Sequence, residues 1–190
     1  MMRLPRFQRI YRAALRVLVY LRTSSSHVLT FHPDASLPLC AYVDADWATK
    51  FSVSGGIISF MSAPVHWYSR TQRSISMSST EAEFFAMCAA VKEILFFRDL
   101  LVDLGFTFSG PTRLATDNKS VVDLTFDAVA FKKTKHILRA AEFVRDLAHR
   151  RVISVHWIAG HNNPADILTK PVALVTSRKL LALIHDLPKF

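Results

Sequence analysis

Three aspartates stand where strands or helices are expected to end or begin: Asp44, Asp117 and Asp166. Carboxylate oxygens are hard ligands, and hard ligands select Mg²⁺ or Mn²⁺. Several carboxylates that converge on one place suit a site with two divalent ions ~3.5–4 Å apart, an arrangement that hydrolyses phosphodiester bonds. Each aspartate also has a structural alternative. Asp117 suits the cap of the helix that follows it, and Asp166 suits a helix N-terminus opened by Asn163 and Pro164.

A fourth carboxylate is expected from a long helix predicted over about residues 80–104, which contains Glu81 and Glu83. Two residues cover about 200° of an α-helix, so these two side chains point to different faces. Positions at helical spacing from Glu83 are all apolar: Ala86, Met87, Ala90, Ile94, Phe97 and Leu101. The face of Glu81 is mixed and partly solvated, and Ser78 with Glu81 fits a capping box. We therefore predict that Glu83 faces the sheet, where a carboxylate is costly unless a bound cation compensates for its burial.

The elements that position these acids follow from apolar periodicity and from Gly, Pro and Asp at the boundaries. Strands are predicted at 27–31 (HVLTF), 37–45 (LPLCAYVDA), 53–61 (VSGGIISFM), 64–70 (PVHWYSR), 112–117 (TRLATD) and 152–159 (VISVHWIA). Helices are predicted at 6–24, 80–104, 118–126, 135–150 and from about 163 onward. Gly105 ends the longest of them. This order predicts an α/β fold, a mixed sheet with helices packed on it.

The composition is that of a globular chain that suits a polyanionic partner. The 190 residues are 51% hydrophobic, enough for a packed core, and the formal net charge is +9 with a pI near 9.9. No apolar run approaches the ~20 residues of a membrane span. Cys40 and Cys88 lie in apolar contexts and are expected to be core thiols. They therefore favour a reducing compartment and argue against a disulfide framework or a zinc site.

The N-terminal region is basic and amphipathic. Residues 1–33 contain no acidic side chain, and their arginines are Arg3, Arg6, Arg9, Arg12, Arg16 and Arg22. The helix expected at 6–24 has one apolar face. A mitochondrial transit peptide has the same composition and stays open as an alternative. We expect three regions in all: a helical connection segment at 1–34, the main domain at 35–172 and a helical tail at 173–190.

Five strings of the sequence, in order, resemble the landmarks of one protein family: YVDADWA, SSTEAEFFAMCAAVKE, TDNKSVVDL, KKTKHI and NPADILTKP. They are similar to those of the ribonuclease H domain of copia-type LTR retrotransposon Pol polyproteins, and the likeness covers about residues 38–172. The string AALRVLVYLRTSS also resembles the segment that links the reverse transcriptase to this domain. The chain departs from the family in a shorter turn between Trp47 and Ser54, and in Gly56, where the family usually has an aromatic residue.

This resemblance implies a ribonuclease H-like fold, a five-stranded mixed sheet with helices on both faces. It carries the catalytic and metal-binding roles over to Asp44, Glu83, Asp117 and Asp166, with two Mg²⁺ ions, or Mn²⁺, as cofactors. Asp46 is then either a residue that supports the metal ligands or only a turn residue, and the turn residue is favoured. The implied reaction is hydrolysis of the RNA strand of RNA–DNA hybrids during retrotransposon reverse transcription, with one ion activating the attacking water and the other stabilising the departing 3′-oxygen.

The resemblance also implies partners and a location. The partners are the RNA–DNA hybrid, whose 2′-hydroxyls help proteins to tell RNA from DNA, and a reverse transcriptase domain in the parent polyprotein. The chain itself contains no polymerase Asp-Asp motif, so it is not expected to polymerise. No membrane partner is expected. The expected location is the cytoplasm, in a virus-like particle, or the nucleus, and the protein is not expected to be secreted.

Further residues have predicted roles with simpler alternatives. His161 is similar to the mobile loop histidine of cellular ribonucleases H, which assists proton transfer or product release, and its alternative is an ordinary surface histidine. A basic group is expected to grip phosphates along the hybrid: Lys132, Lys133, Lys135, His136 and Arg139. Its alternative is a solvated helix face. The tryptophans are expected in the core rather than as platforms for base stacking: Trp47, Trp67 and Trp157.

Two other functions stay open at this point. One is a catalytically inactive or domesticated retroelement relic that binds nucleic acid without cutting it. The other is a different nuclease or a transposase on the same fold, which the order of the four carboxylates and the string ADILTKP disfavour. Metal-dependent cleavage of the hybrid, but not of duplex DNA, would separate the ribonuclease from both.

Overall fold

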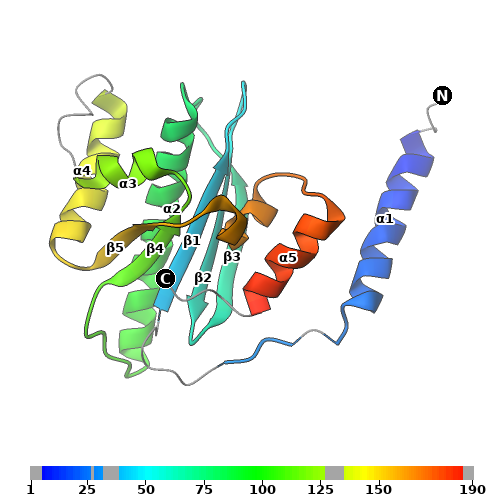
Figure 1. Ribbon diagram of the computed structural model, residues 1–190, viewed down its shortest axis with the longest axis horizontal. Helices are drawn as coiled ribbons and strands as arrows, with labels where there is room; N and C mark the ends of the chain where they lie inside the picture. Colours follow the sequence, from blue (N-terminus) through cyan, green and yellow to red (C-terminus); the bar gives the residue numbers. More distant parts are fainter. Residues whose placement is uncertain (1–5, 27, 32–38, 127–134, 186–190) are drawn as a thin grey trace.

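The computed structural model describes residues 6–26, 28–31, 39–126 and 135–185. Its centre is a five-stranded sheet in the order β3-β2-β1-β4-β5 (Figure 1). The strands are β1 (Leu39–Asp46), β2 (Val53–Phe60), β3 (Ala63–Thr71), β4 (Thr112–Thr116) and β5 (Ile153–Trp157). Neighbours among β1, β2 and β3 pair antiparallel, whereas β4 pairs parallel with β1 and with β5. The predicted mixed sheet is confirmed.

Helices cover both faces of this sheet, as the α/β prediction requires. One face is covered by α2 (Ser79–Asp103), α3 (Lys119–Phe126) and α4 (Lys135–His149). The other face carries the short 3₁₀ helix η3 (Pro164–Leu168), preceded by η2 (Gly160–Asn162), and helix α5 (Leu174–His185). Helix α2 ends as predicted, since Gly105 follows it with a φ of +89°, a left-handed conformation that favours glycine.

Side chains of β1 alternate between two apolar clusters, one on each face of the sheet. The larger cluster, under α2, α3 and α4, takes Leu39, Ala41 and Val43. The smaller cluster, under η3 and α5, takes Cys40 and Tyr42. Because successive residues of a strand point to opposite faces, Asp44 continues the face of Cys40 and Tyr42. Cys40 and Cys88 are both buried and unbridged, which confirms them as core thiols.

The central hairpin explains why Gly56 stands at its position. Gly56 pairs with Val43 of β1 on one side and with Tyr68 of β3 on the other. A Cβ at Gly56 would lie 2.5 Å from the ring of Tyr68, so the ring itself covers this glycine. Tyr68 is 5% exposed, and it is therefore the aromatic side chain of this part of the core.

Helix α1 (Arg6–Thr23) confirms the predicted N-terminal helix, but it lies outside the layers of the sheet and buries none of its residues (Figure 1). The strand predicted at 27–31 is wrong as far as the structure describes it, because residues 28–31 have no regular secondary structure. Val28 and Phe31 are 69% and 52% exposed, so no sheet edge takes up this apolar stretch. Residue 27 lies outside the described residues. Within the described part of the chain, every helix is too short or too polar to cross a membrane.

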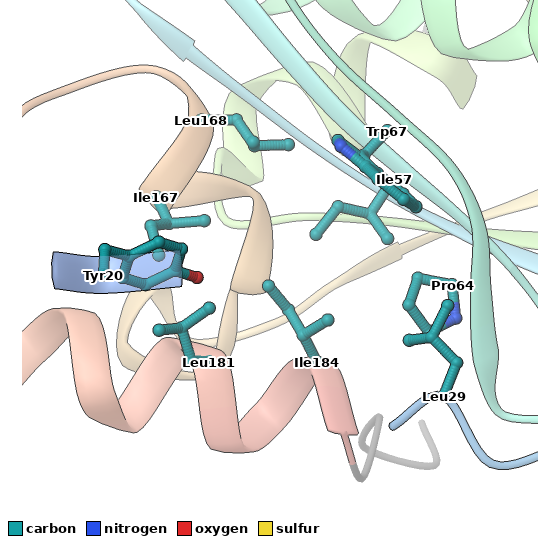
Figure 2. A pocket seen from close by; sticks show the side chains of 9 residues that line it. All are labelled: Tyr20, Leu29, Ile57, Pro64, Trp67, Ile167, Leu168, Leu181 and Ile184. Carbon is teal, nitrogen blue, oxygen red and sulfur yellow. The ribbon is translucent and has the colours of Figure 1, made fainter. Parts of the chain in front are cut away.

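The layer of η3 and α5 leaves part of its face of the sheet uncovered. An apolar cavity of about 350 Å³ lies between the sheet and these helices, with Ile57 and Trp67 on the sheet side and Leu181 and Ile184 on α5 (Figure 2). Tyr20 of α1 also lines it. The cavity contains no carboxylate in its lining, so it is separate from the predicted acidic site.

Candidate active site

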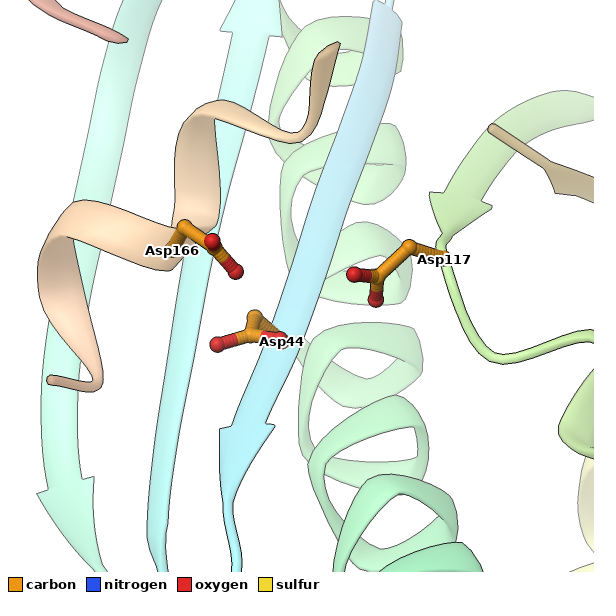
Figure 3. A group of neighbouring side chains, drawn as sticks. All are labelled: Asp44, Asp117 and Asp166. Atoms are coloured by element: carbon orange, nitrogen blue, oxygen red, sulfur yellow. The ribbon is translucent and has the colours of Figure 1, made fainter. Parts of the chain in front are cut away.

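Three of the four predicted acids meet at one edge of the sheet. Asp44 comes from β1, Asp117 follows β4 directly and Asp166 lies in η3. One ligand oxygen from each lies within 4.8 Å of the others, and the three carboxylates point toward one another (Figure 3). The parallel pairing of β1 with β4 explains why Asp44 and Asp117 lie close together. Tyr42 is paired with Ala115, and two residues further along each strand stand the two aspartates.

Glu83 approaches the same place from α2. Its side chain is 8% exposed, and its Oε2 atom has no hydrogen-bond partner among the described residues. Burial, followed by the negative charges of Asp44 and Asp117, raises its pKa to about 9, while a hydrogen bond from the Ala45 backbone lowers it slightly. The predicted orientation of Glu83 toward the sheet is confirmed, although within the described residues it does not join the group that comes within 4.8 Å.

Glu81 has the capping role that the sequence predicts, but its carboxylate accepts from a different amide than in a capping box, and its side chain is buried. The backbone amide of Glu81 donates to Ser78 Oγ at 3.2 Å, as in a capping box. Its carboxylate accepts from the amide of Met77 at 2.7 Å, one residue before the cap. Glu81 is 4% exposed, so the expectation of a partly solvated face is wrong at this turn, because the segment before α2 folds over it.

The carboxylates of the acidic group are partly buried and repel one another. Burial, with smaller contributions from Asp166 and Asp117, raises the pKa of Asp44 to about 6. Burial and the charge of Asp166 also raise the pKa of Asp117. Lys170 Nζ lies 3.1 Å from Asp166 Oδ1. Burial alone lowers the pKa of Lys170, but its hydrogen bond to Asp166 and the nearby acids outweigh this, and the net shift is upward. The group therefore has a local excess of negative charge that suits cations.

Polar side chains to which the sequence analysis gave no role beside these acids hold the group in place. Trp157 Nε1 donates to the carbonyl oxygen of Asp117 at 2.9 Å. Asn163 Nδ2 donates to the carbonyl oxygen of Val43 at 2.9 Å and lies 3.5 Å from Asp117 Oδ1. Thr169 donates to Asp44 Oδ2. Two of these residues, Asn163 and Thr169, belong to the string NPADILTKP. The polar residues around Asp166 in this string were the sequence feature that could have indicated their role.

The remaining predicted residues lie outside the acidic group. Asp46 is the last residue of β1, paired with Val53, so the expectation of a turn residue is wrong. His161 lies in η2 with an exposed side chain. The residue before it, Gly160, is so close to Asp117 that a Cβ there would lie 2.9 Å from Asp117 Oδ2. The catalytic role of His161 stays a prediction.

Only part of the predicted basic group can be placed. Lys132 and Lys133 lie outside the described residues, and so do the side chains of Lys135 and His136. Arg139 lies on α4 with an exposed side chain, which fits a phosphate contact and a solvated helix face equally. The prediction that the tryptophans are core residues is wrong, since Trp47, Trp67 and Trp157 are 48%, 58% and 54% exposed. Trp47 and Trp157 lie at strand ends, and Trp67 lies on the edge strand β3, where it lines the apolar cavity beside α5.

Comparisons with known proteins identify relatives along most of the chain. No protein-family model matches it. It is 32% identical over 178 residues, 90% of this chain, to the retrovirus-related Pol polyprotein from transposon RE2 of Arabidopsis thaliana. It is 31% identical over 165 residues, 85% of this chain, to the corresponding polyprotein from transposon RE1. The chain is a homologue of part of the Pol polyprotein of copia-type transposons. It spans 12% and 11% of the length of these two relatives.

Comparison with solved structures shows the fold of this chain. LC11-RNase H1, isolated from compost, matches 69% of this chain and 91% of its own with a TM-score of 0.55 at 18% identity. The same protein in complex with an RNA/DNA hybrid matches 69% of this chain and 93% of its own with a TM-score of 0.53 at 16% identity. The chain therefore has a ribonuclease H fold, and its three clustered aspartates are compatible with divalent metal binding.

Proposed function

We propose that this chain is a metal-dependent endonuclease that hydrolyses the RNA strand of RNA–DNA hybrids during retrotransposon reverse transcription. The observation that carries the proposal is the meeting of Asp44, Asp117 and Asp166 within 4.8 Å on a ribonuclease H fold. The hybrid bound to LC11-RNase H1 supports the substrate class. The net charge of +9 suits a polyanionic substrate, and the Pol relatives support a reverse transcriptase as partner.

The residues that would hold the metal are the three clustered aspartates and Glu83. All offer carboxylate oxygens, the ligands that Mg²⁺ and Mn²⁺ prefer. A further observation fits a cation here: Glu83 Oε2 is buried without a partner among the described residues, and such an atom is costly unless something binds it. Two ions bound there would supply an activated water and stabilise the charge on the departing oxygen.

The chain's own contribution is to keep these oxygens in place and the substrate aligned. Asp44 lies on β1 and Asp117 directly follows β4, and these adjacent parallel strands are rigid supports for a site of this kind. Trp157 and Asn163 restrain Asp117 through its backbone and its carboxylate. We assign to His161 the role of assisting proton transfer or product release, because the neighbouring residue Gly160 lies close to the Asp117 carboxylate.

The test is cleavage of a labelled RNA–DNA hybrid by the folded chain with Mg²⁺ or Mn²⁺, beside Asp44→Asn and Glu83→Gln variants. We expect cleavage of the RNA strand by the parent chain, none with a chelator, none of duplex DNA, and a strong loss in both variants. Circular dichroism of each variant controls for folding.

An opposite result would favour the inactive relic. In that case the folded parent chain binds the hybrid, with an affinity that falls steeply as salt rises, but yields no product with either metal. Adding a reverse transcriptase domain in trans would then separate true inactivity from a need for that partner to hold the hybrid.

A further inference from the structure

The Thr169 side chain reaches the acidic group directly. Thr169 follows η3, is 7% exposed, and donates its hydroxyl to Asp44 Oδ2 across 125 residues of sequence. The same hydroxyl oxygen lies 3.2 Å from the carbonyl oxygen of Asp166. One buried hydroxyl therefore connects the acid of β1 with the turn that carries the acid of η3.

The methyl group of Thr169 is fixed as firmly as its hydroxyl. Gly55 of β2 pairs with Asp44 across the hairpin. A Cβ at Gly55 would lie 2.7 Å from Thr169 Cγ2 and 2.9 Å from Leu168 Cβ, so only a glycine lets the end of η3 come this close to the sheet. Because Thr is also β-branched and stiff at χ1, its hydroxyl has little freedom to turn away from Asp44.

We infer that Thr169 is a positioning residue for divalent metal: its hydroxyl holds the Asp44 carboxylate in the orientation that faces Asp117 and Asp166. The inference rests on the proposed function, because it needs a metal at these acids. A carboxylate ligand that is already oriented by a hydrogen bond binds a metal ion with less reorganisation. Removing such a supporting contact typically weakens metal binding about 10–100-fold.

Two substitutions separate the two ends of the side chain. Thr169→Val keeps the shape and the methyl contact with Gly55 but removes the hydroxyl. Thr169→Ser keeps the hydroxyl but removes the methyl group. The probe is Mn²⁺ alone, titrated into the full chain and followed by the electron paramagnetic resonance of free Mn²⁺. The melting temperature of each variant in a chelator measures the structural effect.

The positioning role predicts different Mn²⁺ affinities for the two variants. Thr169→Val should bind Mn²⁺ about 10-fold more weakly or worse, and its melting temperature in a chelator should also fall, because the buried Asp44 carboxylate loses a donor. Thr169→Ser should melt earlier but bind Mn²⁺ like the parent. If Thr169→Val binds Mn²⁺ as tightly as the parent, or more tightly, the inference is wrong and Thr169 is only a packing residue.

Hybrid cleavage, measured in parallel, distinguishes a failure of the nuclease proposal from a failure of the role inferred for Thr169. If the parent binds Mn²⁺ and the variants follow the predicted pattern, but no hybrid is cut, the nuclease proposal fails and the role of Thr169 stands. If the parent cuts the hybrid and Thr169→Val binds Mn²⁺ normally, only the role of Thr169 fails. A parent chain that binds no Mn²⁺ overturns both.

Discussion

The side-chain amide of Asn163 donates to the carbonyl oxygen of Val43, the residue before Asp44, at 2.9 Å. Its Nδ2 atom also lies 3.5 Å from Asp117 Oδ1, and its Oδ1 atom accepts from the amide of Ala165 in the turn that leads to Asp166. Asn163 is fully buried. The Asn163 side chain therefore contacts the Asp117 carboxylate and the backbone of the residues that precede Asp44 and Asp166.

The first prediction concerns this amide. Asn163→Ala removes the cap of η3 and leaves the Val43 carbonyl without its buried donor, so we expect the free energy of unfolding to fall by about 2 kcal/mol or more. Asn163→Asp keeps the capping oxygen but loses the donor and adds a negative charge beside Asp117, so it should be at least as destabilising at neutral pH. Urea denaturation of both variants in a chelator measures this.

Asn162 provides the matched control for Asn163. It is the neighbouring residue and its side chain is exposed, so Asn162→Ala should change the free energy of unfolding by less than about 0.5 kcal/mol. Equal effects of the two alanine substitutions would contradict the bridging role of Asn163.

The second prediction separates the two glutamates of α2. Glu83→Gln should abolish hybrid cleavage, since it removes a charged oxygen from the acidic site. Glu81→Gln should keep most of the activity and lose about 1 kcal/mol of stability, since it weakens the contact with the Met77 amide at the start of the helix. Single-turnover cleavage and urea denaturation of both variants check this. Loss of activity in a folded Glu81→Gln with full activity in Glu83→Gln would reverse the assignment.

The third prediction is a pH dependence of stability in a chelator. The pKa of Glu83 is raised from 4.5 to about 9 in the folded chain, by burial first and then by Asp44 and Asp117. Between these two values the folded chain binds more protons than the unfolded chain. The contribution of Glu83 to the free energy of unfolding is therefore complete below about pH 4.5 and is lost as the pH rises toward 9. Urea denaturation at pH 5 to 9 measures the slope.

The comparison with Glu83→Gln isolates this group from other titrations. Burial, and then the charge of Arg113, lower the pKa of His156, which makes the stability rise with pH near neutrality, but this contribution is the same in both chains. The difference in unfolding free energy between the parent and Glu83→Gln should therefore grow in favour of the glutamine as the pH rises. A difference that does not change with pH would show that Glu83 titrates at its ordinary value.

Local patterns in the sequence were enough for most of the elements and for the positions of the acids. Asp44 and Asp117 follow short apolar runs that form strands, and the apolar stripe on α2 gave the orientation of Glu83. These features depend on residues a few positions apart, which is the range over which periodicity and capping act. The strand predicted at 27–31 failed for the same reason, since its apolar residues suggested pairing but no sheet edge accepts them.

What the sequence did not reveal is the set of long-range contacts that hold the site. The bonds from Asn163 to Val43 and from Thr169 to Asp44 join residues 120 and 125 positions apart. The periodicity of apolar residues along the sequence cannot predict such a pair, because the two partners become neighbours only when η3 packs on the sheet. The exposure of Trp67 has a similar origin: it lies on the edge strand β3 and lines the apolar cavity, where η3 and α5 leave their face of the sheet partly uncovered.

The fourth prediction concerns the basic surface that would hold the hybrid. Arg139 is exposed on α4, and a phosphate contact there implies that Arg139→Gln weakens binding and reduces the slope of log affinity against log salt concentration by about 1. Fluorescence anisotropy of a labelled hybrid, titrated at several salt concentrations with Ca²⁺ in place of Mg²⁺, measures both quantities.

The matched control for Arg139 is Arg178→Gln, which removes the same charge from an exposed position of α5, on the opposite face of the sheet. If Arg139 contacts a phosphate, only its substitution lowers the salt slope, whereas the loss of one unit of net charge alone lowers affinity slightly and equally in both variants. Identical slopes for the parent and Arg139→Gln would leave Arg139 on a solvated helix face. The phosphate contacts would then have to come from other basic side chains.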